Sequence, residues 1–241
     1  MIPKIIHYIW FGHSPYPEKV QYCLNSWKRH LPDYEFRLWN EDTFDVNSVL
    51  FTKEAYENKK WAFVSDYVRL YALYKEGGWY LDTDYEVLRS FNGLENHRMV
   101  LGTDDGGYLA ALMGTEPKHP FIKEMLDYYQ NMKFVLPNGN FQMAVINSHL
   151  EKMLAPYGYN IKNEYQELQE DIVVYPDEYF SVLSLENGSM HRTENSYSIH
   201  WHTLLWISPK QKFVKFIRLH IVAPLLGPNL LKKLKKLCGR K

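Results

Sequence analysis

Two carboxylates stand two positions apart in this sequence, directly after a strand-like apolar segment, Trp79–Leu81. Successive strand residues point to opposite faces, so the spacing predicts that Asp82 and Asp84 lie on the same side at the strand's end. Two oxygen donors that face one way suit Mg²⁺ or Mn²⁺, with coordination positions left for the phosphate oxygens of a diphosphate. Such pairs are also common in solvated turns, so the surrounding sequence has to decide.

A largely apolar segment, Trp61–Tyr74, precedes the pair and is predicted to be a buried helix that ends before Gly77 and Gly78. It carries two charges, Asp66 and Arg69, which are three positions apart and therefore share one helical face. In an arbitrary chain, a structural ion pair that neutralises itself in the interior is the favoured interpretation. The alternative is that the pair holds sugar hydroxyls or phosphate beside the metal. The link of Gly77 and Gly78 to the carboxylates is short, so the pair could lie close to them.

The sequence resembles a known family at three places. Residues Ala62–Arg69 and Tyr74–Asp84 resemble the signature of the DXD sugar-transferase family, which contains fungal Golgi mannosyltransferases and many bacterial capsule and lipopolysaccharide glycosyltransferases. Residues Ile2–Gly12 resemble that family's first strand, and Tyr197–Trp201, followed by Trp206, resembles its closing His-aromatic motif. Three matches in the family's order are far more specific than any one of them.

The resemblance implies a GT-A type fold, an α/β domain with a mostly parallel sheet that binds a nucleotide sugar, and a divalent cation, Mn²⁺ or Mg²⁺. Asp84 is then a direct metal ligand, and Asp82 is a metal or ribose contact. His200 is the third candidate ligand and His202 a weaker one. By residue statistics alone, a His between Ile and Trp is more often a packed core residue, and only the motif order favours a ligand.

The resemblance also assigns contacts to the donor. Trp10 is expected to stack on the nucleotide base, while Asp66 and Arg69 are expected to fix the donor sugar and the diphosphate. Tyr80 is a candidate donor contact, although a strand residue at this position could simply pack. Asp66 and Arg69, together with the two carboxylates of the DXD motif, complete the set of candidate catalytic residues.

The activity implied is a metal-dependent, retaining transfer of a hexose or N-acetylhexosamine. The default donor is a UDP-sugar, with GDP-mannose second, and the acceptor is a glycan or a lipid-linked oligosaccharide in surface polysaccharide synthesis. No general base can be named. Asp104 and Asp105 could approach the acceptor, but their spacing favours ordinary turn carboxylates. Residues Asn138–Gln142 depart from the Thr-Gly-Pro of many relatives, which leaves acceptor recognition unassigned.

Composition favours one catalytic domain, predicted over residues 1–208. A length of 241 residues with 46% apolar content supports one sizeable core, and 16% aromatic content suits stacking on sugar or base rings. Cys23 and Cys238 are too few and too isolated for a disulfide framework or a zinc site, which indicates a reducing compartment. We expect no signal peptide and no membrane-spanning segment.

The charge is distributed unevenly along the chain. Residues 195–241 hold 10 Lys or Arg and no Asp or Glu, so residues 1–194 carry 18 basic against 28 acidic groups. The segment 209–241 mixes large apolar residues with Lys at helical spacing and is predicted to form basic amphipathic helices on an anionic membrane surface. A docked C-terminal helix is the plainer alternative. From the basic amphipathic segment we expect a cytoplasmic protein that is peripheral on the inner face of the cell membrane. We expect no nucleic-acid partner.

The order of predicted elements is that of an α/β domain. Strands are expected at 2–11, 36–39, 79–81, 99–101, 109–114 and 172–175, with the His200 segment completing the sheet. Helices are expected at 18–30, 61–74, 120–129 and near 142–150.

Proteins of two other classes share some of these features. A haloacid dehalogenase-type phosphatase also uses Asp-x-Asp after a strand, but it needs Thr or Val where this chain has Glu86, and it carries the motif in its first strand. A non-catalytic carbohydrate-binding or membrane-adaptor protein would use the aromatic residues for glycans and the carboxylates for structure. Metal-dependent nucleotide binding would argue against the adaptor.

Overall fold

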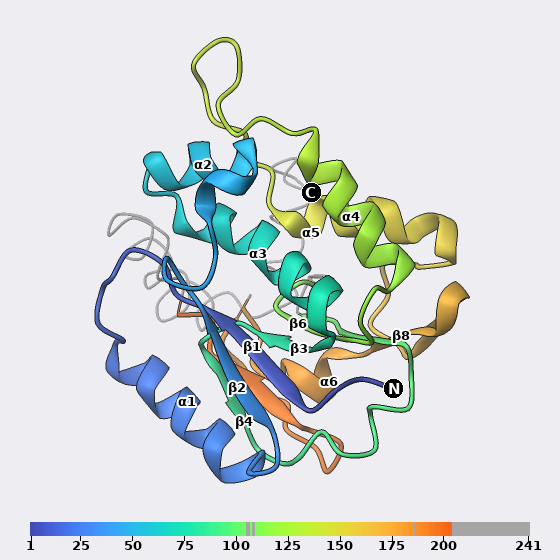
Figure 1. The fold of residues 1–241 in the computed structure, drawn as a ribbon. Helices are drawn as coiled ribbons and strands as arrows, with labels where there is room; N and C mark the ends of the chain where they lie inside the picture. Colours follow the sequence, from blue (N-terminus) through green and yellow to red (C-terminus); the bar gives the residue numbers. More distant parts are fainter. Residues whose placement is uncertain (105–106, 108, 186, 204–241) are drawn as a thin grey trace.

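One seven-stranded sheet runs through the computed structural model, which describes residues 1–104, 107, 109–185 and 187–203 (Figure 1). From edge to edge its strands are β2 (Glu35–Trp39), β1 (Ile5–Ile9), β3 (Gly78–Leu81), β6 (Leu112–Thr115), β5 (Met99–Gly102), β8 (Ile172–Tyr175) and β7 (Gln166–Leu168). All of these except β6 and β7 run in one direction. The predicted α/β domain with a mostly parallel sheet is confirmed.

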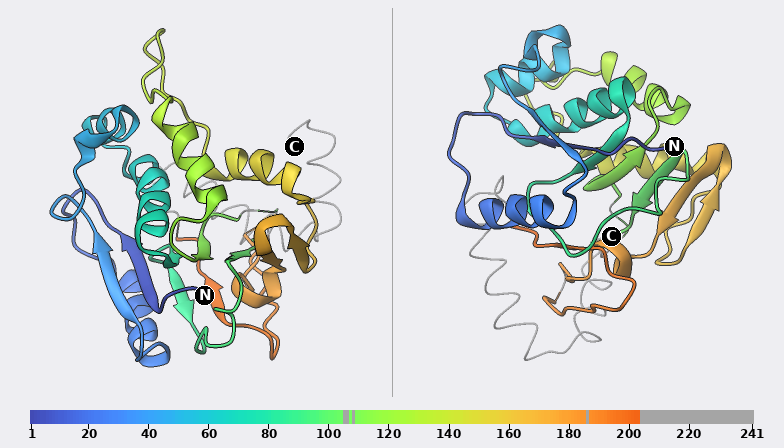
Figure 2. Two further views of the ribbon diagram at one scale, coloured as in Figure 1. Left: turned by 45° about the vertical axis from the view of Figure 1, so that its right-hand side comes forward. Right: turned by 60° about the horizontal axis from the view of Figure 1, so that its bottom comes forward.

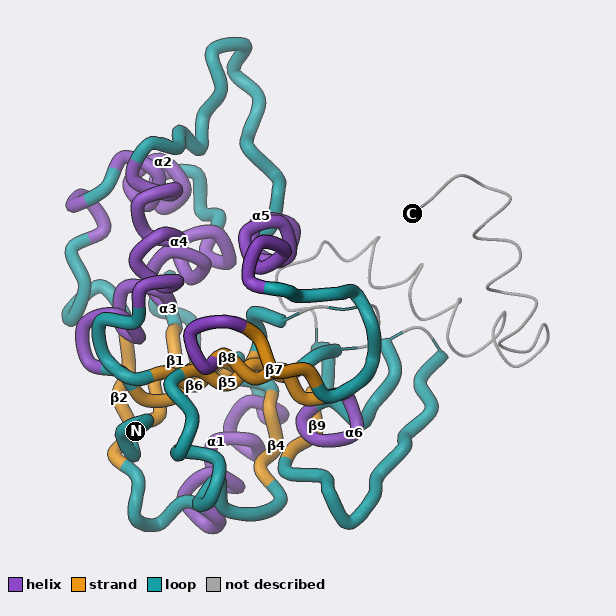
Figure 3. The backbone as a smooth tube through the Cα atoms, turned by 90° about the vertical axis from the view of Figure 1, so that its right-hand side faces the viewer, coloured by secondary structure: helices purple, strands orange, loops and turns teal. Residues whose placement is uncertain are grey.

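Helices cover both faces of the sheet. One face carries α2 (Leu50–Glu57), α3 (Trp61–Glu76), α4 (Pro120–Gln130) and α5 (Ile146–Leu154), and the other carries α1 (Glu18–His30) and the short α6 (Asp177–Phe180) (Figure 3). A two-stranded sheet, β4 (Tyr85–Val87) with β9 (Ser198–His200), lies on the side of α1. Figure 2 shows the loop between α4 and α5 projecting away from this body.

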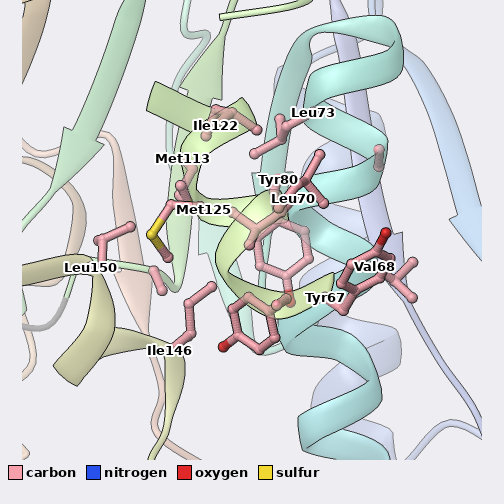
Figure 4. Packing of buried hydrophobic residues seen from close by; sticks show 14 of the residues in the cluster. Tyr67, Val68, Leu70, Leu73, Tyr80, Met113, Ile122, Met125, Ile146 and Leu150 are labelled. Carbon is pink, nitrogen blue, oxygen red and sulfur yellow. The ribbon is translucent and has the colours of Figure 1, made fainter. Parts of the chain in front are cut away.

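The helix α3 is buried because apolar residues occupy nearly all of its faces. Figure 4 shows Leu70 and Leu73 of α3 packed among Tyr80 and Met113 of the sheet and Met125 of α4. On the opposite face, a second core gathers apolar side chains of α1, β3, β4 and α6.

The glycine pair after α3 lets the chain turn directly into the centre of the sheet. Gly77 ends α3 with φ 65° and Gly78 opens β3 with φ 97°, both in the region that favours glycine. A Cβ atom on Gly78 would lie 2.7 Å from the carbonyl oxygen of Ile5 in β1. These two glycines therefore let β3 lie close against β1, which positions Asp82 and Asp84 just after β3.

Most of the expected elements form, and one strand pairs elsewhere. The His200 segment was expected in the main sheet, but β9 pairs antiparallel with β4, where His200 lies opposite Tyr85 and their rings stack. Helices α2 and α6 and strands β4 and β7 are not among the expected elements, and α5 begins at Ile146, not near 142. The predicted amphipathic tail, 209–241, lies outside the described residues. Among the described helices, none has both the length and the apolar character needed to cross a bilayer.

Candidate metal and donor site

The DXD carboxylates lie in a tight turn at the carboxyl end of β3. The strand ends at Leu81, and the N–H of Tyr85 donates to the carbonyl oxygen of Asp82 at 3.0 Å. The sequence argument placed both carboxylates on one side by the two-residue repeat of a strand, but here the turn brings them together. Asp104 follows β5, a neighbouring strand beyond β6, so the same edge of the sheet supplies a third carboxylate.

Asp82, Asp84 and His200, which the family resemblance assigns as metal ligands, lie close together, and their binding of a metal stays a prediction. Each offers one ligand atom, and these atoms all lie within 4.8 Å of one another. The Nε2 atom of His200 is 3.3 Å from Oδ1 of Asp84. The Asp82 side chain is 32% exposed, whereas that of Asp84 is 11% exposed. Asp82 therefore lies nearer to solvent, and Asp84 and His200 form the floor of the group.

Asp84 is held in its charged form. Its Oδ2 accepts hydrogen bonds from the N–H of Thr203 at 2.7 Å and from the Thr203 hydroxyl at 2.8 Å. Burial acts to raise the pKa of Asp84, but the charge and hydrogen bond of His200, with the two Thr203 donors, lower it below its usual range. A carboxylate that stays ionised at neutral pH is the form that binds a cation.

His200 lies between two carboxylates and against an aromatic ring. Its Nδ1 is 3.1 Å from Oδ2 of Asp104, and its ring stacks on Tyr85 with centroids 4.5 Å apart. Burial acts to lower the pKa of His200, but Asp84 and Asp104 raise it to about 10. No sequence signal linked Asp104 to His200, because 96 positions separate them in the chain.

His202 lies beside His200 but faces a different partner. Its Nε2 is 3.0 Å from the carbonyl oxygen of Leu183 and 3.4 Å from Oδ1 of Asp104. Burial and the neighbouring His200 charge lower the pKa of His202 to about 4. Asp104, His200 and His202 form a second group of potential ligands.

The first group fits a divalent cation. Two carboxylates and one imidazole supply hard oxygen donors and one nitrogen donor, a combination open to Mn²⁺ and, through its oxygens, to Mg²⁺. Three coordinating side chains would leave positions on the cation for the oxygen atoms of a bound small molecule. The group lies at the carboxyl ends of strands, where open α/β sheets bind nucleotides.

Asp66 and Arg69 form the buried ion pair that the sequence favoured as a structural interpretation. Nη2 of Arg69 is 3.0 Å from Oδ1 of Asp66, and Oδ2 of Asp66 accepts a hydrogen bond from the N–H of Ile146, at the start of α5. Burial raises the pKa of Asp66 to about 6, against the opposing effect of Arg69. Asp66 thus joins α3 to α5, and its contact with a donor sugar stays a prediction.

Arg69 and Tyr80 both reach Asp82. The Tyr80 hydroxyl donates to Oδ1 of Asp82 at 2.5 Å, and Nη1 of Arg69 lies 3.6 Å from the same oxygen. Nη1 also donates to the carbonyl oxygen of Ala110 at 2.8 Å. These contacts fix one oxygen of Asp82, while Oδ2 has no hydrogen-bond partner within the described part of the chain. Diphosphate binding by Arg69 remains a prediction.

Trp10 follows directly after β1, at the same edge of the sheet. Its indole N–H donates to the carbonyl oxygen of Ser14 at 2.6 Å, and its ring meets Tyr16 edge-on with centroids 5.1 Å apart. The residue is partly buried. Stacking on a nucleotide base stays a prediction for this residue.

The segment that contains the DXD turn has known relatives. Residues 17–101 match a family model described as "Glycosyltransferase sugar-binding region containing DXD motif". Inositol phosphoceramide mannosyltransferase 3 of Schizosaccharomyces pombe is 32% identical over 130 residues, covering 52% of this chain and 36% of that protein. Inositol phosphoceramide mannosyltransferase 2 of the same yeast is 28% identical over 132 residues, covering 51% and 37%. The chain spans little more than a third of these relatives.

A solved structure described as PaToxG glycosyltransferase aligns with a TM-score of 0.48 and 20% identity, over 64% of this chain and 68% of that one. The sequence match includes Asp82 and Asp84 and ends before His200, which the fold brings to them. Residues 17–101 thus match a glycosyltransferase sugar-binding region that contains a DXD motif, and about half of the chain is similar to two yeast mannosyltransferases.

Proposed function

We propose that this protein is a metal-dependent, retaining glycosyltransferase that moves a hexose or N-acetylhexosamine from a UDP-sugar to a glycan acceptor. The observation that carries the proposal is the convergence of Asp82 and Asp84 with His200. The two carboxylates belong to the matched sugar-binding region, while the imidazole comes from a strand more than 100 positions later. Local sequence alone does not produce that meeting; the fold does.

In this proposal the buried Asp84 and His200 and the more exposed Asp82 would hold the cation. A bound cation would supply positive charge that stabilises the departing nucleoside diphosphate. Thr203 keeps Asp84 ionised and oriented, and Tyr80 fixes one oxygen of Asp82 so that the other faces outward. Burial of the floor of the group excludes water and strengthens each charge interaction there.

The donor assignment places Trp10 on the base, with Asp66 and Arg69 near the sugar and diphosphate. Arg69 is positive and lies 3.6 Å from Asp82, so it is close enough to the DXD turn to share a ligand with it. UDP-sugars are the proposed donors. The curated relatives are named as mannosyltransferases, which makes GDP-mannose the second donor to test. A glycan or lipid-linked oligosaccharide of a surface polysaccharide is the proposed acceptor.

Nucleotide release from a panel of UDP-sugars and GDP-mannose, with Mn²⁺ or with a chelator, tests the proposal, because slow donor hydrolysis needs no acceptor. We expect release from one donor that depends on the metal and is lost in Asp84→Asn. Asp127→Asn, which changes an exposed carboxylate on α4, is the matched control and should keep the release. Release that survives both the chelator and Asp84→Asn would contradict the proposed site.

We also propose that residues 209–241 hold the protein on an anionic membrane at the cytoplasmic face. The support is the sequence, in which all 10 Lys or Arg of residues 195–241 stand without a single Asp or Glu. Co-sedimentation with vesicles of anionic lipid should weaken when Lys232, Lys233, Lys235 and Lys236 are changed to Gln. Unchanged co-sedimentation of that variant would contradict the membrane assignment.

A further inference from the structure

A buried carboxylate outside the DXD motif contacts the proposed histidine ligand. Oδ2 of Asp104 lies 3.1 Å from Nδ1 of His200, and both side chains are buried. Asp104 comes from the end of β5 and His200 from β9, so two separate parts of the fold supply the contact. The ring of His200 is also stacked on Tyr85, which restricts its plane.

The chemistry of this contact decides which ring nitrogen is available. An ionised carboxylate only accepts hydrogen bonds, so Nδ1 of His200 carries a proton and donates a hydrogen bond to Asp104. The other nitrogen, Nε2, faces the Asp84 carboxylate at 3.3 Å and also carries a proton in the metal-free protein. A cation would take the place of that proton, so Nε2 is the nitrogen that can bind a metal. A carboxylate behind a metal-bound imidazole fixes its tautomer and orientation and raises its basicity as a ligand.

His202, the other histidine at the closing motif, makes its Nε2 hydrogen bond to a backbone carbonyl. Nε2 of His202 is 3.0 Å from the carbonyl oxygen of Leu183, which only accepts hydrogen bonds, so Nε2 carries a proton. The same atom lies 3.4 Å from Oδ1 of Asp104. The Nε2 proton is thus directed at Leu183, and His202 does not offer Nε2 to a metal.

We propose that Asp104 is a positioning residue of the metal site, which holds His200 with Nε2 toward the cation. This inference rests on the proposed metal-dependent function. It assigns the ligand role to His200 and not to Nε2 of His202, and it makes Asp104 part of the donor site although it lies outside the DXD motif.

Direct titration of the protein with Mn²⁺, with free Mn²⁺ followed by electron paramagnetic resonance, tests the role without any turnover. Loss of an outer carboxylate of this kind lowers metal affinity about 10- to 100-fold. We expect that loss in Asp104→Asn and a near-complete loss in His200→Ala, while Asp127→Asn binds as the unaltered protein does. Equal affinity in a folded Asp104→Asn would overturn the role of Asp104. Absence of Mn²⁺ binding in the unaltered protein would overturn the proposed function and this role with it.

Nitrogen NMR of the imidazole rings in the unaltered protein loaded with Zn²⁺, a diamagnetic ion that accepts imidazole nitrogen, gives a second test that does not depend on how a variant folds. The proposal requires that Nδ1 of His200 is protonated and that Nε2 is not. A proton on Nε2 of His200 in the loaded protein would overturn it. A merely structural contact between Asp104 and His200 would leave Mn²⁺ affinity unchanged, which the titration detects.

Discussion

The charge on His200 should make the stability of the metal-free protein depend on pH. Burial acts to lower the pKa of His200, but Asp84 and Asp104 raise it to about 10, compared with 6.5 for an ordinary histidine. The folded state therefore binds this proton more tightly than the unfolded state does. The stability gained is fully present below about pH 6.5 and is lost as the pH rises through about 10.

The size of the effect follows from the two pKa values. The difference between 6.5 and about 10 corresponds to about 5 kcal/mol, because each pKa step is worth roughly 1.4 kcal/mol. The lowered pKa values of Asp84 and Asp104 express the same charge interaction and add nothing to this figure. Breaking a buried charge pair commonly costs about 3–5 kcal/mol, which agrees in magnitude.

Urea unfolding of the unaltered protein and of His200→Gln, both in a chelator, measures the effect as a difference. Near neutral pH the unaltered protein should be several kcal/mol more stable than the variant, and the gap should close as the pH approaches about 10. His191→Gln, which removes an exposed imidazole, controls for the substitution. A gap between the unaltered protein and His200→Gln that stays constant over this range would refute the assignment of the charge to His200.

Three further substitutions probe the sheet and the DXD turn. Tyr80→Phe removes the hydroxyl that donates to Asp82 at 2.5 Å and should weaken Mn²⁺ binding about tenfold, since a hydrogen bond to a charged group is worth about 1.5–3 kcal/mol; calorimetry measures the affinity. Asp82→Asn should lower Mn²⁺ affinity more than it lowers stability, because this side chain is 32% exposed; calorimetry and urea unfolding together separate the two. Gly114→Ala would place a Cβ atom 2.6 Å from the ring of Trp79 and should cost about 1–3 kcal/mol of unfolding free energy, measured in urea; an unchanged midpoint would contradict this packing.

The sequence was most informative where local pattern and chemistry agreed. The helix Trp61–Glu76 and the strand before Asp82 follow from apolar pattern and from the glycines between them. The position of Asp84 relative to Asp82 was predicted correctly but for a different reason, since the pair lies in a turn and not on a strand.

Long-range contacts set the limit of prediction at the site. His200 was assigned by its place in a motif, and no property of its neighbours indicated that β9 would leave the main sheet and pair with β4. Asp104 reads as a turn carboxylate in sequence, and only the adjacency of β5 to the DXD turn across β6 brings it to His200. The local sequence pattern predicts the helix or strand to which a residue belongs. The contacts of His200 and Asp104 depend instead on how elements far apart in the chain pack together.

The most direct test of the metal site is the anomalous scattering of a crystal soaked in Mn²⁺ and UDP. The account predicts a peak at the group formed by Asp82, Asp84 and His200, with Nε2 of His200 and Asp84 as ligands and the diphosphate on the exposed side. A peak at Asp104 and His202 alone, or no peak at either group, would contradict it.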